Sequence, residues 1–373
     1  MVQIHSPRPL QTLRTPKQMH SANDPDNDVN LGKWKAGIGR RLGCAFAWIC
    51  VLLLTVWCVA ALYFDFPFPR LRLPSAIAYA LYVPGVLFFF RENSWRLLIC
   101  LGGFVLVLAW WLTLKPSNNR NWQADVAQTA WAEVNGDLVT IHNYRNCDYR
   151  AEFEYTCKWE TKTVRLSELR GIDVAFIHWG LPMIAHMIVS FRFADDDYVA
   201  ISIEMRKQVG QSYSAIRGFF RQYTLIYIFA DERDLIRLRA NFRKDEGVYL
   251  YRTTADQDYS RRLFLQYLKR GNQLHERPEW YNAVTSNCTT SVFAEMLAIG
   301  PLPPGISRLD PRILLSGGAD EMLYNAGYLA GKLPFNELRE QAHINPAARA
   351  AGDSADFSRT IRAGRTGFET QPQ

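Results

Sequence analysis

The chain has 373 residues, enough for a membrane segment and one or two ordinary domains. Its hydrophobic content of 48% is too low for a transporter built from membrane helices throughout, but it fits a soluble domain on a membrane anchor. The net charge of +7 is modest, and no basic stripe with interleaved aromatic residues follows the N-terminal region. The sequence therefore argues against a nucleic-acid-binding protein.

Residues 1–42 form a polar N-terminal segment. They contain seven Lys or Arg and three Asp, a net charge of +4, with many Pro, Ser, Asn and Gln and no apolar periodicity before residue 32. Such a composition predicts a disordered tail. Arg40 and Arg41 directly precede the first long apolar stretch, so the positive-inside rule places the tail in the cytoplasm. That stretch starts too late and is too long for a cleaved signal peptide.

Residues 43–115 are predicted to be a membrane anchor. Apolar stretches cover residues 43–64, 76–90 and 95–114, and a helix needs about 20 residues to cross a bilayer. The middle stretch is shorter and contains Pro84, so it is either a third span or a re-entrant segment. We favour three spans, which place everything after Lys115 outside the cytoplasm. Two spans would leave it inside.

The remaining chain has an α+β pattern. Residues 116–300 are expected to form one domain, followed by a C-terminal extension over residues 301–373 that becomes disordered from about residue 350. The predicted helices cover residues 231–242 and 256–270 and the segment after Cys288. The predicted strands are residues 137–144, 152–159, 172–179, 185–193, 198–207 and 223–230.

Three cysteines lie in the soluble part, and four more (Cys44, Cys50, Cys58 and Cys100) lie in the spans. Cys147 and Cys157 flank a short strand or hairpin, a separation at which a disulfide can form in an oxidising compartment. Cys288 would then be the free thiol. There is no CxxC pair and no histidine cluster, so we expect no metal site, although a metal site is the alternative use of these cysteines.

Cys288 is the candidate nucleophile. It stands in the polar segment from Ser286 to Thr290, directly before an apolar run with helical spacing, and so falls in the first turn of a predicted helix. The helix dipole and free N–H groups there should lower the pKa of its thiol. The alternative is a buried structural cysteine.

A cysteine nucleophile needs a base, which is normally a histidine oriented by a third polar group. If Phe193 lies opposite Val199 in the hairpin of residues 185–207, the apolar residues share one face. The other face then carries His186 with Glu204 as its diagonal neighbour, which makes His186 the preferred base. A surface His–Glu pair is the alternative reading of this pattern.

Other polar side chains compete for roles in the site. His178 is the main rival of His186, but its continuously apolar surroundings favour a core histidine or one that lines the site. Tyr281 and Asn287 are possible oxyanion donors, with a loop tyrosine and a plain helix N-cap as the respective alternatives. The remaining histidines stand in polar surroundings and are expected at the surface: His142, His275 and His343.

Several of these segments, in this order, resemble the Lnb-type N-terminal periplasmic domain family over about residues 122–338. They are residues 185–191, 201–207, 218–223, 281–282, 287–290 and 314–317. The family is similar to permuted papain-like cysteine enzymes, in which the histidine strand precedes the cysteine helix, as His186 precedes Cys288 here. The resemblance implies that fold, a periplasmic domain of the bacterial inner membrane, Cys288 as nucleophile and His186 as base.

Characterised members resembling Lnb transfer a fatty acyl chain from phospholipid to the amino-terminal cysteine of lipoproteins. The resemblance thus implies a multi-pass acyltransferase or hydrolase that acts on phospholipid or lipoprotein through an acyl-thioester at Cys288, without a cofactor or nucleic-acid partner. This chain has its spans before the domain, whereas Lnb has them behind it, so the acceptor stays open. The alternatives are a cysteine peptidase or amidase acting on cell-wall peptide and a non-catalytic periplasmic binding domain.

Overall fold

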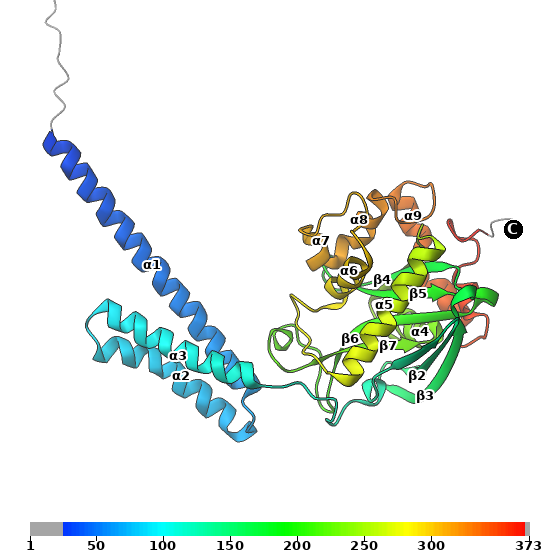
Figure 1. Ribbon diagram of the computed structural model, residues 1–373, viewed down its shortest axis with the longest axis horizontal. Coiled ribbons are helices and arrows are strands. Elements are labelled where there is room, and N and C mark those ends of the chain that lie inside the picture. The colour runs from blue at the N-terminus through cyan, green and yellow to red at the C-terminus, as the bar shows by residue number, and fades with distance from the viewer. Residues whose placement is uncertain (1–24, 370–373) are drawn as a thin grey trace, which may run out of the picture. The chain divides into compact units, whose positions relative to one another are not determined.

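The computed structural model describes residues 25–369 (Figure 1). The chain divides into two compact units, one comprising residues 1–59 and 77–106 and the other residues 60–76 and 107–373. Most of the expected disordered tail, residues 1–24, lies outside the described residues. The rest of that expectation is wrong, because α1 (Pro25–Asp65) already begins at Pro25. Proline suits the first turn of a helix, and an apolar segment that is already helical extends without a new nucleation step.

Three helices near the N-terminus are long and apolar enough to cross a membrane. The candidate spans are Arg41–Asp65 within α1, all of α2 (Pro69–Phe89) and all of α3 (Asn93–Thr113). The middle stretch, left open as a span or a re-entrant segment, is one helix of 21 residues with Pro84 inside it. The expectation of three spanning-length helices is therefore confirmed.

The centre of the second unit is an eight-stranded sheet with the order β1-β2-β7-β6-β5-β4-β8, and β3 pairs with β2. All neighbouring pairs are antiparallel except β2 with β7. The six predicted strands are present and two were missed, the first and the last. The strands are β1 (Trp131–Asn135), β2 (Leu138–Ala151), β3 (Glu154–Arg165), β4 (Gly171–Trp179), β5 (Ala185–Arg192), β6 (Tyr198–Arg206), β7 (Thr224–Ala230) and β8 (Glu246–Arg252).

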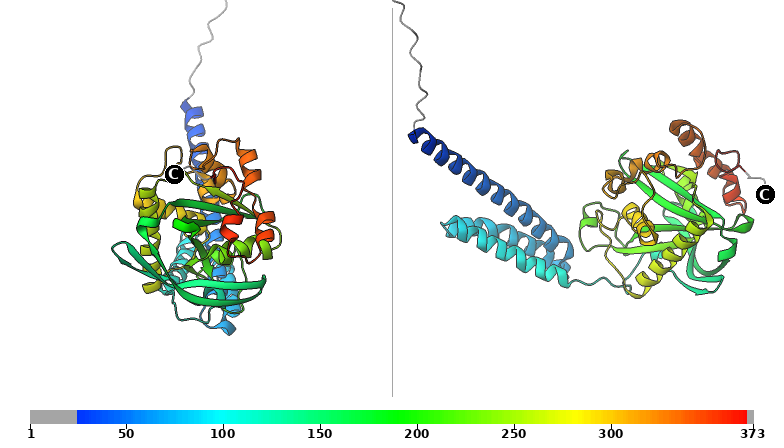
Figure 2. Two further views of the ribbon diagram at one scale, coloured as in Figure 1. Left: turned by 90° about the vertical axis from the view of Figure 1, so that its right-hand side faces the viewer. Right: turned by 45° about the horizontal axis from the view of Figure 1, so that its top comes forward.

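Helices cover both faces of the sheet, as the left view of Figure 2 shows with yellow helices on one side and red ones on the other. One face packs on α5 (Gln257–Glu276), α6 (Cys288–Ile299) and α8 (Ala319–Asn325), in a cluster that includes Met187, Val189 and Phe191 of β5. The other face packs on α4 (Glu232–Arg237), the π-helical turn Leu238–Phe242, α10 (Asn345–Ala351) and α11 (Phe357–Thr360), and includes Ile188. The shorter helices α7 (Pro311–Leu314) and α9 (Phe335–Ala342) complete the domain.

The register of the β5–β6 hairpin differs from the expected one by two residues. Phe191, not Phe193, pairs with Val199, because the connection is longer and contains Asp195 and Asp196 with φ of 57° and 55°. Aspartate tolerates this left-handed region better than most residues. An even shift keeps every side chain on its expected face, but it places Glu204 opposite His186 rather than diagonal to it.

The C-terminal extension is part of the domain, so the expectation of disorder after residue 350 is wrong. Phe357 and Ile361, one helical turn apart, are fully buried in the second cluster. Arg362 is also buried and donates to Asp173 at 2.8 Å and to Glu232 at 2.6 Å and 2.8 Å. The segment is polar on average, and this composition led to the prediction of disorder. One buried guanidinium and two buried apolar side chains are nevertheless enough to fix it to the domain.

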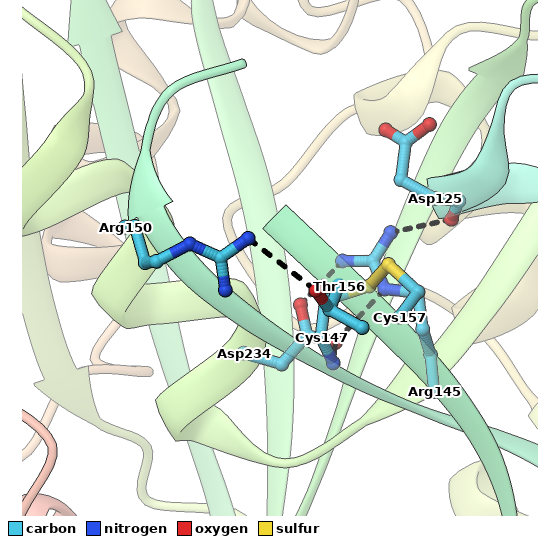
Figure 3. The surroundings of a disulfide bond; sticks show 7 residues. All are labelled: Asp125, Arg145, Cys147, Arg150, Thr156, Cys157 and Asp234. Carbon is cyan, nitrogen blue, oxygen red and sulfur yellow. Dashed lines mark hydrogen bonds and ion pairs between the residues drawn. A yellow bond between two sulfur atoms is a disulfide. The ribbon is translucent and has the colours of Figure 1, made fainter. Parts of the chain in front are cut away.

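Cys147 and Cys157, the predicted disulfide candidates, lie opposite each other in β2 and β3 and form a disulfide (Figure 3). The N–H of Cys147 donates to Asp234 at 2.8 Å, and Asp234 forms a buried ion pair with Arg145 at 2.6 Å. The disulfide therefore joins two long strands directly beside the point where β2 is bonded to α4.

Replacing Arg362 with Ala should lower the free energy of unfolding of the domain by about 3–5 kcal/mol, because Asp173 and Glu232 would lose their buried partner. Arg359→Ala is the matched control, since Arg359 is 66% exposed and its ion pairs should contribute less than about 1 kcal/mol. Denaturant unfolding of the detergent-solubilised protein measures both. Equal effects would contradict the role assigned to Arg362.

Candidate active site

Cys288 is the first residue of α6, as the sequence predicts. Asn287 caps the helix in a capping box: its Oδ1 accepts from the Thr290 N–H at 2.9 Å, and the Thr290 hydroxyl accepts from the Asn287 N–H at 3.0 Å. The Asn287 side chain also donates to the carbonyl of Ala283 at 3.0 Å. Asn287 thus has the N-cap role that the sequence left as the alternative to oxyanion binding.

The sulfur of Cys288 lies against the backbone edge of β5. It is 3.9 Å from the carbonyl oxygen of Ala185 and 3.8 Å from the hydroxyl of Thr289, and the backbone N–H of Met187 lowers the pKa of the thiol. The hydroxyl of Ser316 bonds both the N–H (2.9 Å) and the carbonyl (2.5 Å) of Ala185. Pairing of β5 with β6 ends at Ile188 and Ser202, so α6 and Ser316 occupy the edge that β6 leaves.

His186 approaches the same gap from the other face of the sheet. Its Nε2 is 2.7 Å from the hydroxyl of Ser202, which donates to Glu204 at 2.9 Å. A hydroxyl has one hydrogen, so Ser202 must accept from Nε2–H, and this network assigns the lone pair to Nδ1. Nδ1 is the atom that can accept a proton. Glu204 is also 3.7 Å from His186 Nε2 and accepts from Arg239 at 3.2 Å.

Burial and neighbouring charges fix the protonation states of this pair. Burial, together with Arg239 and Arg243, lowers the pKa of His186 to about 3, although Glu204 acts in the opposite direction. Burial would raise the pKa of Glu204, but Arg239 and His186 hold that pKa well below its usual value. At neutral pH His186 is therefore a neutral imidazole beside an ionised carboxylate.

The expectation that the helix terminus lowers the pKa of Cys288 is wrong for this conformation. Burial raises the pKa of the thiol, and the Glu204 charge adds to the rise, while hydrogen bonds from Thr289 and Met187 act against them. Loss of water around the sulfur outweighs the favourable field of the helix. Among residues 25–369 no hydrogen bond joins Cys288 to His186, so the resting thiol is protonated and unpaired with its expected base.

The site lies inside a segment with a known relationship. Residues 155–316 match the family described as the Lnb N-terminal periplasmic domain. This segment belongs to that family. The match contains β4 to β8, His186 and Cys288, and with the three apolar helices it fits a membrane-anchored periplasmic protein. No curated protein and no solved structure matches the chain.

Two tyrosines complete the surroundings of Cys288 in the Lnb-type domain. Tyr281 is half-buried, and burial together with the charges of Cys288, Tyr213 and Glu204 raises its pKa, so its hydroxyl keeps its proton. Tyr213 is exposed, and burial of its hydroxyl and the charge of Cys288 raise its pKa too. The sequence named Tyr281 but not Tyr213, which stands in a loop without a recognisable pattern.

His178, the rival base, belongs to a different network of the Lnb-type domain. Its Nε2 is 3.8 Å from the buried carboxylate of Asp320 and 3.4 Å from Arg339. In the described part of the chain it makes no hydrogen bond to Cys288. Of the histidines expected at the surface, His275 is exposed, whereas His142 and His343 are half-buried.

Three polar residues of the site had no role assigned from the sequence: Ser202, Arg239 and Ser316. The strand pattern placed Ser202 on the same face as His186 and Glu204, but it did not show that Ser202 links them. The roles of Arg239 and Ser316 could not be predicted, since each residue reaches the site from an element distant in the chain.

Cys288 should react with iodoacetamide more slowly than a free cysteine at neutral pH, because its raised pKa leaves less thiolate. Its rate should keep rising at pH values where a free thiol has reached its plateau. Mass-spectrometric counting of labelled Cys288 peptide against pH checks this. If the labelling rate of Cys288 reached its plateau at a lower pH than that of free cysteine, the field of the helix terminus would outweigh burial in setting the pKa.

His186 should make the domain less stable in acid. Its folded pKa of about 3 lies below the ordinary value of 6.5, so the unfolded chain binds the proton more readily between these values. The free energy of unfolding should therefore fall as the pH drops from about 6.5 towards 3, by up to about 1.4 kcal/mol per pH unit. His186→Gln should show a shallower fall in parallel denaturant titrations. Identical slopes for the two proteins would exclude a buried neutral His186.

Proposed function

We propose that this protein is a cysteine enzyme of the permuted papain-like class that forms an acyl-thioester at Cys288 and takes the acyl group from a membrane lipid. One observation carries the proposal. Cys288 enters the gap between β5 and β6 from one face, and His186, with a free Nδ1 and a fixed tautomer, lines the gap from the other. Active-site hydrogen bonds are often long in an unliganded enzyme and tighten when substrate binds, so the missing Cys–His bond does not oppose it.

The reaction divides into two steps. In the first, Nδ1 of His186 takes the thiol proton as the sulfur attacks the ester carbonyl, and the departing alkoxide receives that proton when the C–O bond breaks. In the second, an amine or a water molecule attacks the thioester, His186 takes its proton, and Cys288 leaves and is reprotonated. Glu204, acting through Ser202, stabilises the imidazolium that forms in each step.

Two backbone N–H groups and one phenol are placed to stabilise the oxyanion. The N–H groups of Met187 and Thr289 both favour the ionised form of the Cys288 thiol, and we propose that they also donate to the oxygen on the attacked carbon. Tyr281 adds a hydroxyl whose raised pKa keeps it a donor. Fixed donors of this kind contribute most where water is excluded.

The surroundings favour an acyl donor over a peptide. A cavity of about 40 Å³ lies between the sheet and α6, lined mainly by apolar side chains that include Met187, Val292, Phe293 and Met296. Cys288 does not line this cavity, but Met187 does, and the backbone N–H of Met187 favours the ionised form of the Cys288 thiol. We propose that this apolar interior receives the first carbons of an acyl chain bonded to Cys288.

We propose that the chain crosses the bacterial inner membrane three times from a cytoplasmic N-terminus, which would put the domain in the periplasm at the outer leaflet. A tether of this kind raises the effective concentration of the enzyme towards lipids and lipid-bearing proteins without any new binding contact.

The proposed topology predicts that an export-dependent reporter fused at about residue 120 is active. An inactive export reporter with an active cytoplasmic one would contradict it.

Purified protein given phospholipid in detergent, without an acceptor, should accumulate a fatty-acyl adduct. Intact-mass analysis should show an adduct that hydroxylamine removes, that Cys288→Ala never forms and that His186→Ala forms at least about 100-fold more slowly, the usual contribution of a general base. Glu204→Gln should slow it less. Cys100→Ala is the matched control for acylation of the other free thiols and should behave as wild type.

The result also separates the alternatives. Faster loss of the adduct on adding a lipopeptide with a free amine marks a transferase, and slow loss in water marks a lipase-like enzyme. Cleavage of cell-wall peptide with no adduct from any phospholipid would make the protein a peptidase or amidase. If neither acylation nor peptide cleavage is detected, the protein is a non-catalytic binding domain.

A further inference from the structure

A buried carboxylate fixes the loop before β7 to the ends of two apolar helices. Asp65, the last residue of α1, is 7% exposed and accepts hydrogen bonds from Trp111 Nε1 (2.7 Å), the Arg221 N–H (3.1 Å) and Gln222 Nε2 (2.6 Å). Gln222 also donates to the carbonyl of Phe64 at 2.8 Å. All these residues belong to one compact unit. A buried carboxylate with three donors forms a specific joint, because moving the loop would leave the charge unpaired.

Aromatic contacts strengthen this joint. The guanidinium of Arg221 lies 4.0 Å from the ring centroid of Trp111 and donates to the carbonyl of Leu112 at 3.3 Å. The ring of Phe220 lies 5.1 Å from that of Phe64. Tryptophan and arginine at the end of a membrane span are typical of the bilayer interface. The candidate spans end at Asp65 and Thr113, so residues 220–222 lie beside the ends of two candidate spans.

Five large apolar residues beside this joint are exposed, and we call them the loop patch: Val209, Tyr213, Ile216, Phe219 and Val284. Their exposed fractions are 59%, 55%, 63%, 46% and 43%. Four lie on the loop that ends at the joint. Val284 lies on the neighbouring loop, which the Ala283 N–H bonds to the Gly218 carbonyl at 2.9 Å. Single exposed apolar residues are ordinary, but such a group on two adjoining loops indicates a binding surface.

The loop patch borders the candidate active site. Tyr213 is close enough to Cys288 for the thiolate charge to affect its pKa, and the second loop leads through Asn287 directly to Cys288. Basic side chains accompany the two loops: Arg217 lies between Ile216 and Gly218, and Arg120 stacks 5.1 Å from the ring of Trp280. Cations next to apolar side chains suit the boundary between anionic headgroups and acyl chains.

We propose that the loop patch inserts into the headgroup–acyl boundary of the membrane that holds the spans, and so seals the mouth of the Cys288 site against the bilayer. The binding partner of the loop patch follows from the joint. Because the loop is fixed to the ends of the spans, the bilayer around those spans is the nearest apolar environment for its side chains. This docking does not depend on the thiol chemistry. A lipid could then reach Cys288 along the patch without crossing water.

Photo-crosslinking tests the docking in the full chain. Ile216 or Phe219 is replaced by p-benzoylphenylalanine in a Cys288→Ala background, which excludes acyl adducts, and the protein is irradiated in nanodiscs of phosphatidylethanolamine and phosphatidylglycerol. Phe153 is the matched control: it is 87% exposed and lies at the β2–β3 turn. β2 runs parallel to β7 and continues beyond Ala230, the end of β7 opposite the joint, so the turn that carries Phe153 lies at the other end of β7 from residues 220–222.

Intact-mass analysis should show a phospholipid adduct at positions 216 and 219 at least several-fold more abundant than at position 153. Adding Ile216→Asp should reduce the adduct at position 219, because a charge cannot enter the acyl region. Equal adducts at all three positions, or a protein–protein product at 216 and 219 in place of lipid, would overturn the proposal. If the protein that retains Cys288 formed no acyl adduct while the lipid crosslinks at positions 216 and 219 were present, only the proposed reaction would be refuted.

Discussion

Hydrogen bonding between β5 and β6 stops at Ile188 and Ser202, although β6 continues to pair with β7 as far as Arg206. The first residues of β5 therefore have an unpaired backbone edge inside the domain, and buried backbone groups require partners. Ser316 and Cys288 supply them. If the pairing continued, the backbone of Glu204 would occupy the place of the Cys288 sulfur. The thiol, the histidine and the carboxylate can meet only because the two strands separate here.

The elements that carry the charges beneath this gap are held together by Asn345, which lies beyond the family match. Glu204 is paired with Arg239, and Arg239 with Glu246, which lie on the π-helical turn and β8. Asn345 holds these two elements together, since it accepts from the Val248 N–H at 2.8 Å and donates to the carbonyls of Ala240 (3.1 Å) and Glu246 (2.9 Å). Buried ion pairs add little net stability, but they set the protonation state of His186. The C-terminal segment thus contributes to the electrostatics of a site that it does not touch.

One loop connects the membrane anchor to this site. The loop between β6 and β7 follows Glu204, carries Tyr213 near the thiol and ends at Arg221 and Gln222 on the carboxylate of Asp65. The strand β7 then starts, and its first residue bridges to Trp280. The carboxylate of Asp65 thus joins this loop to the ends of α1 and α3 by hydrogen bonds.

The sequence by itself determined the local elements. Three apolar stretches, six alternating strands, the start of α6 at Cys288 and the cysteine pair of β2 and β3 follow from periodicities and spacings within about 20 residues. The faces of β5 and β6 also followed, because an error of two residues in register does not change which side a residue occupies. The pairing of His186 with Glu204 was found for this reason.

Only the tertiary structure decided the pKa of Cys288, the polar link through Ser202, the Arg239 and Arg362 ion pairs and the burial of Phe357, Ile361 and Arg362. Each depends on groups that are far apart in the chain and on the loss of water between them. The field at a helix terminus can be read from sequence, but the desolvation that opposes it is a property of all the surrounding atoms. For this reason the sequence located the thiol but could not determine its protonation state.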